Sequence, residues 1–347
     1  MKYKGAIIGF GFIAEGHLYA YKNQQMLEIT AIADVSPERR ERAKDLIHPV
    51  KVFDNIDELL EQAEIDFVDV CTPPYARYEI MKKCLKNGKH VIGEKPFLAD
   101  CEEYKELLSI ARDVNAIIYP SHNYKYAPIV RNIYNFMRTK EFGTVLTAHF
   151  RTLRVGHALG VTGWEENWRR IPEFSFGGII RDHGPHSIYV ACYLIGQYPI
   201  SVSCVSGCLN QTFTNTEDTA LITLFYEDNV TVLLDLSWCA DRRDTFYHIY
   251  GSKQNVLIDN DRIIRTNSDG EVEIETIDSH FNDPSHKNWF VEVLNDFSQT
   301  LVSGKNDMQL MKESFITCVV IEAAYQSAAS NGKIINIKDR ISKFTWR

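Results

Sequence analysis

Lys95, Asp182 and His186 are the side chains whose types and spacing could carry out chemistry. Lys95 follows an apolar run, within residues 93–96, and a partly desolvated ammonium there can hydrogen-bond a substrate oxygen and polarise it. Asp182 and His186 lie four residues apart after a glycine pair, so on one helical turn they would share a face. An imidazole beside a carboxylate is suited to proton transfer near neutral pH. The alternatives are a solvated lysine at a strand end and a buried histidine with a structural hydrogen bond.

The same segment admits a second interpretation, a metal site. Asp182, His183 and His186 all carry ligand atoms, but His183 would point elsewhere on a helix and no further ligand at helical spacing is evident. The eight cysteines are scattered through mostly apolar runs, and no pair of pairs has zinc-ligand spacing. We therefore predict no metal, and reduced, mostly buried cysteines.

A glycine-rich turn near the start of the chain must position the first of these groups. The apolar residues 6–8 lead into the pattern G-x-G-x-x-A between Gly9 and Ala14. Gly9 allows the bend, Gly11 lets a pyrophosphate approach the backbone, and the helix N-terminus offers N–H donors to phosphate. Asp34 ends the next strand-like run, 20 residues past Ala14, where an acid would bind a ribose 2′-hydroxyl. A plain strand–helix turn with a solvated Asp34 is the alternative.

Strand and helix signals alternate through the first third of the chain. We expect strands at 6–8, 29–33, 50–53, 66–71, 90–92 and 116–119, and helices at 37–47, 56–62, 78–86 and 101–114. This order implies a doubly wound parallel sheet of the Rossmann type, with helices on both faces. Ligands of such sheets bind beyond the carboxyl ends of the strands, where we expect Gly9, Asp34, Thr72, Pro73, Glu94, Lys95 and Pro96.

The pattern changes after a predicted helix at 128–138. An irregular loop at 151–176 and a helix at 183–194 are expected, and then strands at 144–150, 201–205, 219–225, 230–238, 245–250, 256–258 and 272–277. Helices at 289–301 and 308–330 and a strand at 334–337 complete the prediction. The fold class is α/β: a Rossmann domain over 1–123, and over 124–347 an α+β domain with an open, mainly antiparallel sheet. One face of that sheet needs cover, which favours a homodimer or homotetramer built on it.

Composition excludes several classes of protein. The chain has 347 residues, 45% hydrophobic and 24% charged, which is enough for two domains with sizeable cores. A net charge of −8 argues against a nucleic-acid or anionic-membrane partner. No apolar stretch approaches a membrane span and the N-terminus has no signal-peptide pattern, so we expect a cytoplasmic protein.

Five motifs in order resemble the Gfo/Idh/MocA oxidoreductases, the glucose–fructose oxidoreductase and inositol dehydrogenase group. They are the glycine turn from Gly9, Asp34, the Thr-Pro-Pro of residues 72–74, the Gly-Glu-Lys-Pro of residues 93–96, and the Gly-Gly-x-x-x-Asp-x-Gly-x-His of residues 177–186. The resemblance spans nearly the whole chain. It implies a bound NAD(H) or NADP(H), a sugar, sugar derivative or cyclitol as substrate, and catalytic roles for Lys95, Asp182 and His186.

Four positions depart from that family's pattern. An Asn and a His commonly found after Thr-Pro are Pro74 and Arg77 here, an Arg is replaced by Lys125, and a third glycine is replaced by Phe176. These departures leave the catalytic set intact but weaken any assignment of a named substrate. The cofactor-binding residues that we expect are Gly9, Gly11, Phe12, Ile13, Asp34, Thr72, Pro73, Glu94 and Lys95.

The resulting hypothesis is reversible hydride transfer between a nicotinamide and a secondary alcohol. His186 takes the alcohol proton, Asp182 orients it or holds a neighbouring hydroxyl, and Lys95 stabilises alkoxide charge; either Lys95 or His186 could be the proton acceptor. Asp34 favours NAD, while Arg39 and Arg40 keep NADP open. The expected substrate-binding residues are Lys95, Asn123, Lys125, Trp168, Arg169, Asp182 and His186. A hydrolase or lyase with transient oxidation, and a non-catalytic NAD-binding regulator, are the alternatives.

Overall fold

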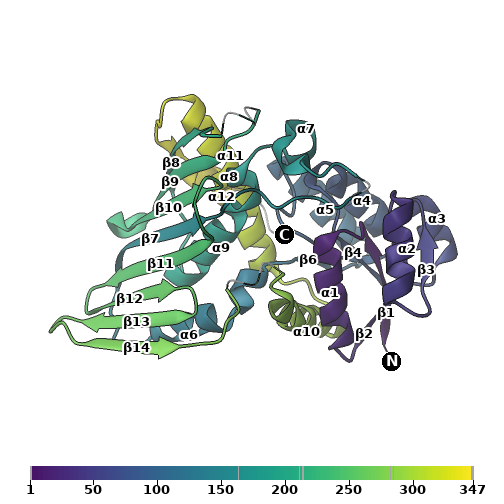
Figure 1. Ribbon diagram of the computed structural model, residues 1–347, viewed down its shortest axis with the longest axis horizontal. Helices are drawn as coiled ribbons and strands as arrows, with labels where there is room; N and C mark the ends of the chain where they lie inside the picture. The colour runs from purple at the N-terminus through teal and green to yellow at the C-terminus, as the bar shows by residue number, and fades with distance from the viewer. Residues whose placement is uncertain are drawn as a thin grey trace. The chain divides into compact units, whose positions relative to one another are not determined.

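The computed structural model describes residues 2–162, 164–210, 212, 215–281, 283 and 285–344. They divide into two compact units, whose elements are labelled in Figure 1. The first unit contains residues 1–123, 159–176 and 285–314, and the second contains residues 124–158, 177–284 and 315–347.

The first unit is built on a six-stranded sheet in the order β3-β2-β1-β4-β5-β6, with every pair parallel. This order confirms the predicted doubly wound Rossmann sheet. Strands β1, β2, β4 and β5 are adjacent, so their carboxyl ends lie at one edge of the sheet. The strands are β1 (Tyr3–Ile8), β2 (Leu27–Ala33), β3 (Lys51–Phe53), β4 (Phe67–Val70), β5 (His90–Gly93) and β6 (Ile118–Pro120).

Three helices between these strands begin at a residue whose side chain accepts from a free backbone N–H group. Ser36 accepts from Arg39 at the start of α2, Asn55 from Glu58 at the start of α3, and Asp100 from Glu102 at the start of α5. Helix α1 packs on α10, and α4 packs on α5. The helices of this unit are α1 (Phe12–Lys22), α2 (Pro37–Leu46), α3 (Ile56–Gln62), α4 (Pro74–Lys86), α5 (Cys101–Asp113), η2 (Trp168–Arg170), α7 (Pro172–Ser175) and α10 (Lys287–Ser303).

Helix α4 starts four residues earlier than the sequence predicts. Pro73 is its N-cap and Pro74 its first residue. A proline lacks the N–H that a first-turn residue leaves unpaired, so the two prolines start the helix instead of delaying it.

The second unit is built on a nine-stranded sheet in the order β14-β13-β12-β11-β7-β10-β9-β8-β15. Only the β7–β10 pair is parallel, so the sheet is mixed but mainly antiparallel, as predicted. The strands are β7 (Val145–Leu153), β8 (Ser201–Gly207), β9 (Thr219–Phe225), β10 (Thr231–Ser237), β11 (Asp244–Gly251), β12 (Gln254–Asp259), β13 (Arg262–Asn267), β14 (Val272–Thr276) and β15 (Ile335–Asn336).

Helices cover one face of this sheet, as Figure 1 shows for α8 and α9. Buried residues alternate with half-exposed ones along the central strands, so the two faces differ. Val205, Leu221 and Tyr250 are exposed and alternate with buried neighbours, which places them on the face away from the helices. The remaining helices are η1 (Asn123–Tyr126), α6 (Pro128–Phe136), α8 (Ile179–Asp182), α9 (Gly184–Ile195), η3 (Glu227–Asn229), α11 (Met308–Ala329) and α12 (Lys338–Lys343).

Two features of the second half differ from the sequence prediction. Strand β13 was not expected; it pairs with β12 through a tight turn at Asn260, whose φ of 53° is left-handed. Its sequence, Arg-Ile-Ile-Arg-Thr-Asn, lacks the period-two pattern that marks the other strands. The helix expected over 183–194 is instead α8 and α9, which are separated at His183.

All eight cysteines are free thiols. In the part of the chain that the structure describes, no helix has the length and apolarity needed to span a bilayer.

Candidate functional site

The glycine turn lies at the carboxyl end of β1 and opens α1. Gly9 has a φ of 85°, and a Cβ there would lie 2.9 Å from the Thr72 methyl group and 3.0 Å from the Thr72 nitrogen. Only glycine meets both demands without strain. Gly11 is the N-cap of α1; no side chain caps this helix, and a Cβ at Gly11 would meet open space. The first N–H groups of α1, at Phe12 and Ile13, therefore suit a phosphate.

Asp34 lies at the carboxyl end of β2 and shapes the same turn. Its carboxylate accepts hydrogen bonds from the backbone N–H of Phe10 (2.6 Å) and of Ser36 (2.8 Å). The nearby Arg39 donates to the Phe10 carbonyl and pairs with Glu15 at 2.6 Å. These contacts fix the carboxylate at the position where the sequence predicts ribose binding.

Arg77 joins the loops that follow β4 and β5. Its guanidinium donates to the carbonyl oxygens of Thr72 (2.8 Å) and Glu94 (2.9 Å), and also to that of Pro96. Arg77 is buried on α4, and the Lys95–Pro96 peptide is cis. The position at which this sequence departs from the family pattern therefore holds the Thr-Pro-Pro and Glu-Lys-Pro segments together.

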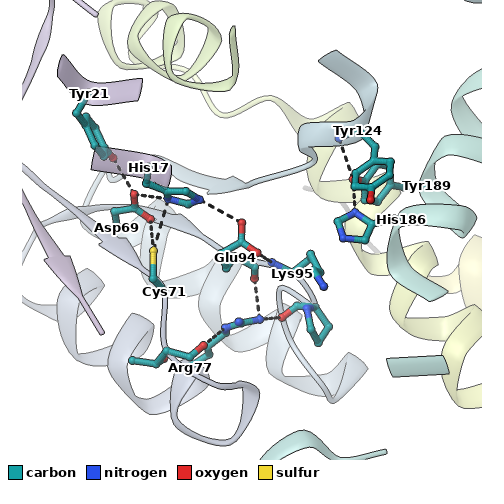
Figure 2. Close-up of polar contacts among 12 residues, drawn as sticks. His17, Tyr21, Asp69, Cys71, Arg77, Glu94, Lys95, Tyr124, His186 and Tyr189 are labelled. Atoms are coloured by element: carbon teal, nitrogen blue, oxygen red, sulfur yellow. Dashed lines mark hydrogen bonds and ion pairs between the residues drawn. The ribbon is translucent and has the colours of Figure 1, made fainter. Parts of the chain in front are cut away.

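Glu94 belongs to a buried polar cluster beneath the Glu-Lys-Pro segment, shown in Figure 2. Its Oε1 lies 3.3 Å from His17 Nε2, and His17 Nδ1 lies 2.8 Å from Asp69 Oδ2. Tyr21 donates to the same Asp69 oxygen at 3.0 Å, and the Cys71 thiol lies 3.4 Å from the other oxygen. His17 comes from α1, Asp69 from β4 and Glu94 from the end of β5, so the cluster joins three parts of the Rossmann sheet.

The charges in this cluster are complementary. Burial alone would lower the pKa of His17, but Asp69 and Cys71 outweigh it, and the net pKa lies well above 6.5. Burial would raise the pKa of Glu94, yet His17, with Lys95 and Arg77, holds it below 4.5. An imidazolium therefore lies between two carboxylates at neutral pH.

We predict that His17→Leu destabilises the fold by about 3–5 kcal/mol, because it leaves the Asp69 charge buried without its cation. Since the folded-state pKa of His17 is raised, its contribution is complete below pH 6.5 and is lost as pH rises through the folded-state pKa. The Tm difference between wild type and His17→Leu should therefore narrow as pH rises above 6.5. Tyr21→Phe removes an uncharged hydrogen bond to the same carboxylate, so its Tm difference from wild type should not change with pH. If the Tm differences of both variants narrow equally as pH rises, His17 is not cationic.

The cluster also raises the question of a metal. The ligand atoms of His17, Asp69 and Cys71 lie within 4.8 Å of one another. Burial and Asp69 raise the pKa of the Cys71 thiol to about 12, so it stays protonated, and His17 Nδ1 already bonds Asp69. A hydrogen-bonded cluster explains the geometry, and the absence of a metal remains a prediction.

Lys95 follows Glu94 at the carboxyl end of β5. Its backbone N–H donates to Glu94 Oε2 at 3.2 Å, and Figure 2 shows its side chain extending away from that carboxylate. Asn123 is buried just after β6, in the same unit. Trp168 and Arg169 lie in η2, where the guanidinium carbon of Arg169 is 4.2 Å from the Trp168 ring centroid.

Asp182 and His183 lie at the junction of α8 and α9 in the second unit. Asp182 Oδ2 is 3.2 Å from His183 Nδ1, and the indole N–H of Trp238 donates to the same nitrogen at 3.3 Å. The His183 ring is 6.5 Å from that of His186, so His183 does not point away from the candidate base as the sequence had indicated; residues three apart on a helix are neighbours.

The glycine pair before this junction serves packing. A Cβ at Gly178 would overlap the Glu217 carbonyl, and one at Gly177 the Tyr325 hydroxyl. Glu217 in turn accepts from the N–H groups of Gly178 (2.9 Å) and Ile180 (3.0 Å). Phe176, which replaces the third glycine of the family pattern, has a φ of 59°.

His186 is held at the start of α9 by two tyrosines, as Figure 2 shows. Its Nδ1 lies 2.7 Å from the Tyr189 hydroxyl, whose oxygen accepts the backbone N–H of Tyr124 at 3.1 Å. The Tyr124 ring lies 4.1 Å from the imidazole. When Nδ1–H donates to Tyr189, Nε2 is left as a base, which is the state that a proton acceptor needs.

Lys125 lies in η1 and contacts the far part of α9. Its ammonium is 4.8 Å from the centroid of the Tyr193 ring. Tyr193 is seven residues past His186, a rise of about 10 Å along the helix.

A parallel Rossmann sheet with an uncapped glycine turn, joined to a mixed open sheet, defines a dinucleotide-dependent oxidoreductase class. Residues 3–122 match the oxidoreductase family with the NAD-binding Rossmann fold, and residues 130–257 match the GFO/IDH/MocA C-terminal domain. The chain belongs to the Gfo/Idh/MocA family, as its motifs indicated.

Relatives of this chain include dehydrogenases of sugars. D-apiose dehydrogenase of Paraburkholderia graminis is 23% identical over 69% of this chain and 61% of its own length. The uncharacterized protein YMR315W of Saccharomyces cerevisiae is 24% identical over 83% of this chain and 84% of its own. A solved levoglucosan dehydrogenase, in complex with NADH and levoglucosan, superposes with a TM-score of 0.85 at 18% identity, covering 97% of this chain and all of that one. At that identity the likeness concerns the fold.

Sequence reasoning did not find several residues of these sites. His17 and Asp69 gave no signal because their contact joins positions 52 residues apart. Tyr189 could have been found, since it lies three residues past His186 on the same helix.

Proposed function

We propose that this protein is an NAD-dependent dehydrogenase or reductase that acts on a secondary alcohol of a sugar, sugar derivative or cyclitol. The observation that carries the proposal is the His186 imidazole, held through Nδ1 by Tyr189 within a family of NAD-binding oxidoreductases. The names of D-apiose dehydrogenase and levoglucosan dehydrogenase support a sugar-like substrate.

The residues at the carboxyl edge of the Rossmann sheet fit a dinucleotide. Gly11 and the first N–H groups of α1 would hold the pyrophosphate, and Asp34 would bind the ribose. The nicotinamide would be bordered by Thr72, Pro73 and Glu94. A bound nicotinamide supplies the hydride acceptor or donor.

NAD is the proposed cofactor rather than NADP. The Asp34 carboxylate would repel a 2′-phosphate, and Arg39 already pairs with Glu15. The Arg40 guanidinium donates to the carbonyls of Asp34 and Val35. Both arginines therefore have partners within the protein, and neither has to be assigned to the 2′-phosphate of NADP.

Three residues would carry the reaction. His186 Nε2 would take the alcohol proton, and the ammonium of Lys95 would stabilise the developing alkoxide. Asp182 would hold a neighbouring hydroxyl or act on His186 through the junction of α8 and α9. Asn123, Trp168 and Arg169 remain proposed substrate contacts, and Lys125 remains one despite its place over Tyr193.

The test is a panel of sugars, inositols, sugar phosphates and nucleotide sugars, each offered with NAD⁺ and with NADP⁺. We expect reduced cofactor to accumulate with NAD⁺ and at least one class of polyol, followed by NADH absorbance. Release of free sugar without net NADH would instead indicate a hydrolase or lyase with transient oxidation. Tight NAD binding without turnover of any substrate would indicate a regulatory protein.

The face of the second sheet away from the helices is the proposed assembly surface. Val205 is 63% exposed and Leu221 47% exposed on it. A second copy of this chain would bury these side chains, giving a homodimer or, by a further contact, a homotetramer. Native mass measurement tests this proposal.

A further inference from the structure

Two arginines lie near each other at one end of the second sheet. The antiparallel pairing of β7 with β11 ends at Leu153 and Asp244, and Arg154 and Arg243 are the residues just beyond that last pair. Because side chains alternate along strands, both lie on the helix-covered face, with the buried Thr152. Like charges directly opposite each other on a sheet are destabilising.

Arg154 is buried without enough hydrogen-bond partners. It is 4% exposed, and its Nη1 donates to the carbonyls of Leu153 (2.7 Å) and Asp244 (2.9 Å). Its Nε and Nη2 are buried and find no hydrogen-bond acceptor among the residues that the structure describes. Hydrogen bonds within the protein therefore explain the burial of Nη1. The burial of Nε and Nη2 without hydrogen bonds costs free energy.

Arg243 extends the same positive region. Burial and the charge of Arg154 both lower its pKa, which means that the two guanidinium groups repel each other. Arg243 also hydrogen-bonds the side chain of Tyr124. The carboxylate of Asp244 lies on the opposite face by strand alternation.

The arginines lie next to the candidate base. Tyr124, which bonds Arg243, places its ring 4.1 Å from the His186 imidazole. Thr152, two residues before Arg154, lies 3.5 Å from Ser187, the residue after His186. A group bound by the two arginines would therefore lie close to the atom that His186 is proposed to deprotonate.

We propose that Arg154 and Arg243 form an anion subsite that binds a carboxylate or phosphate group of the substrate. This inference rests on the proposed function and narrows its substrate to an acidic sugar or a sugar phosphate. A guanidinium presents parallel N–H donors that match the oxygens of either group, so an anion would satisfy the two orphaned donors and relieve the repulsion.

The test measures anion binding directly, so it does not depend on turnover. Malonate and inorganic phosphate are titrated separately into the whole protein at constant ionic strength, with chloride as the balancing salt, by calorimetry. We expect saturable binding of at least one probe; binding of malonate alone assigns a carboxylate, and binding of phosphate alone assigns a phosphate ester. NADH is titrated into the same samples, so loss of cofactor binding, which would count against the proposed function, is seen separately.

Matched variants locate the subsite. Arg243→Gln should weaken binding of the probe about 10–100-fold, the loss expected for hydrogen bonds to a charged group. Arg242→Gln, which changes an exposed arginine one residue away, should bind as wild type does. Arg154→Lys, which keeps the charge but loses the fork, should also weaken binding and serves if the first variant fails to fold. Absence of saturable binding to either probe, or equal weakening in Arg242→Gln and Arg243→Gln, would overturn the proposal.

Discussion

Replacing His186 with alanine is expected to lower kcat about 10²–10⁴-fold, the usual contribution of a general base. Binding of NADH should be unchanged, because the glycine turn and Asp34 belong to the other unit. The physical reason is the loss of the imidazole, whose Nδ1 lies against Tyr189 and whose Nε2 is the proposed proton acceptor. Stopped-flow or steady-state NADH formation measures kcat, and fluorescence titration measures NADH binding.

Two further variants separate chemistry from structure. Tyr189→Phe keeps the imidazole but removes the partner of Nδ1, so the pH profile of kcat should shift while NADH binding stays the same. His280→Asn changes an exposed histidine of the same unit and keeps a residue that tolerates its φ of 52°, so its kcat should equal that of wild type. Unchanged turnover in His186→Ala would remove His186 from the mechanism.

Replacing Lys95 with methionine is expected to lower kcat about 10²–10³-fold, the effect of removing one donor to a developing oxyanion. Methionine keeps much of the volume and loses the charge. The fold should survive, because the Lys95 backbone N–H still donates to Glu94 and Arg77 still holds the loop through carbonyl groups. Turnover and NADH affinity are measured on the same samples.

Two variants serve as comparisons for Lys95→Met, one at the protein surface and one in the buried cluster beneath Lys95. Lys83→Ala removes an exposed lysine of α4 that pairs with Asp57, and it should leave kcat unchanged. Glu94→Gln keeps the side-chain shape but removes the charge 3.3 Å from His17, so it should lower both thermal stability and kcat. If Lys95→Met retains full kcat while Glu94→Gln loses it, the segment positions the loop and the ammonium has no catalytic role.

Local sequence signals were sufficient for the first sheet. The glycine turn, the capping residues of α2 and α3 and the buried apolar strands each depend on neighbours a few residues away, and the six parallel strands follow from them. Errors included boundaries, such as the start of α4 at Pro74, the break between α8 and α9, and β13, whose partner strand supplies the pattern that its own residues lack.

Contacts between residues far apart in the chain could not be predicted from local sequence signals. Residues 159–176 and 285–314 join the first unit without any local feature that assigns them to it. The imidazolium of His17 depends on Asp69 and Glu94, 52 and 77 positions away, and Arg154 and Arg243 come near each other because β7 pairs with β11. Register is set by packing of whole faces, which single residues do not report.

The sequence alone therefore determined the Rossmann turn, the family and the types of group able to carry out hydride and proton transfer, because these depend on residue type and short spacing. The tertiary structure decided which groups are charged, oriented or left without partners. Burial and neighbouring charge set the pKa values of His17 and Glu94, α9 brings Tyr189 to His186, and strand pairing sets two guanidinium groups side by side. Electrostatic energy depends on distance and burial, and folding fixes both.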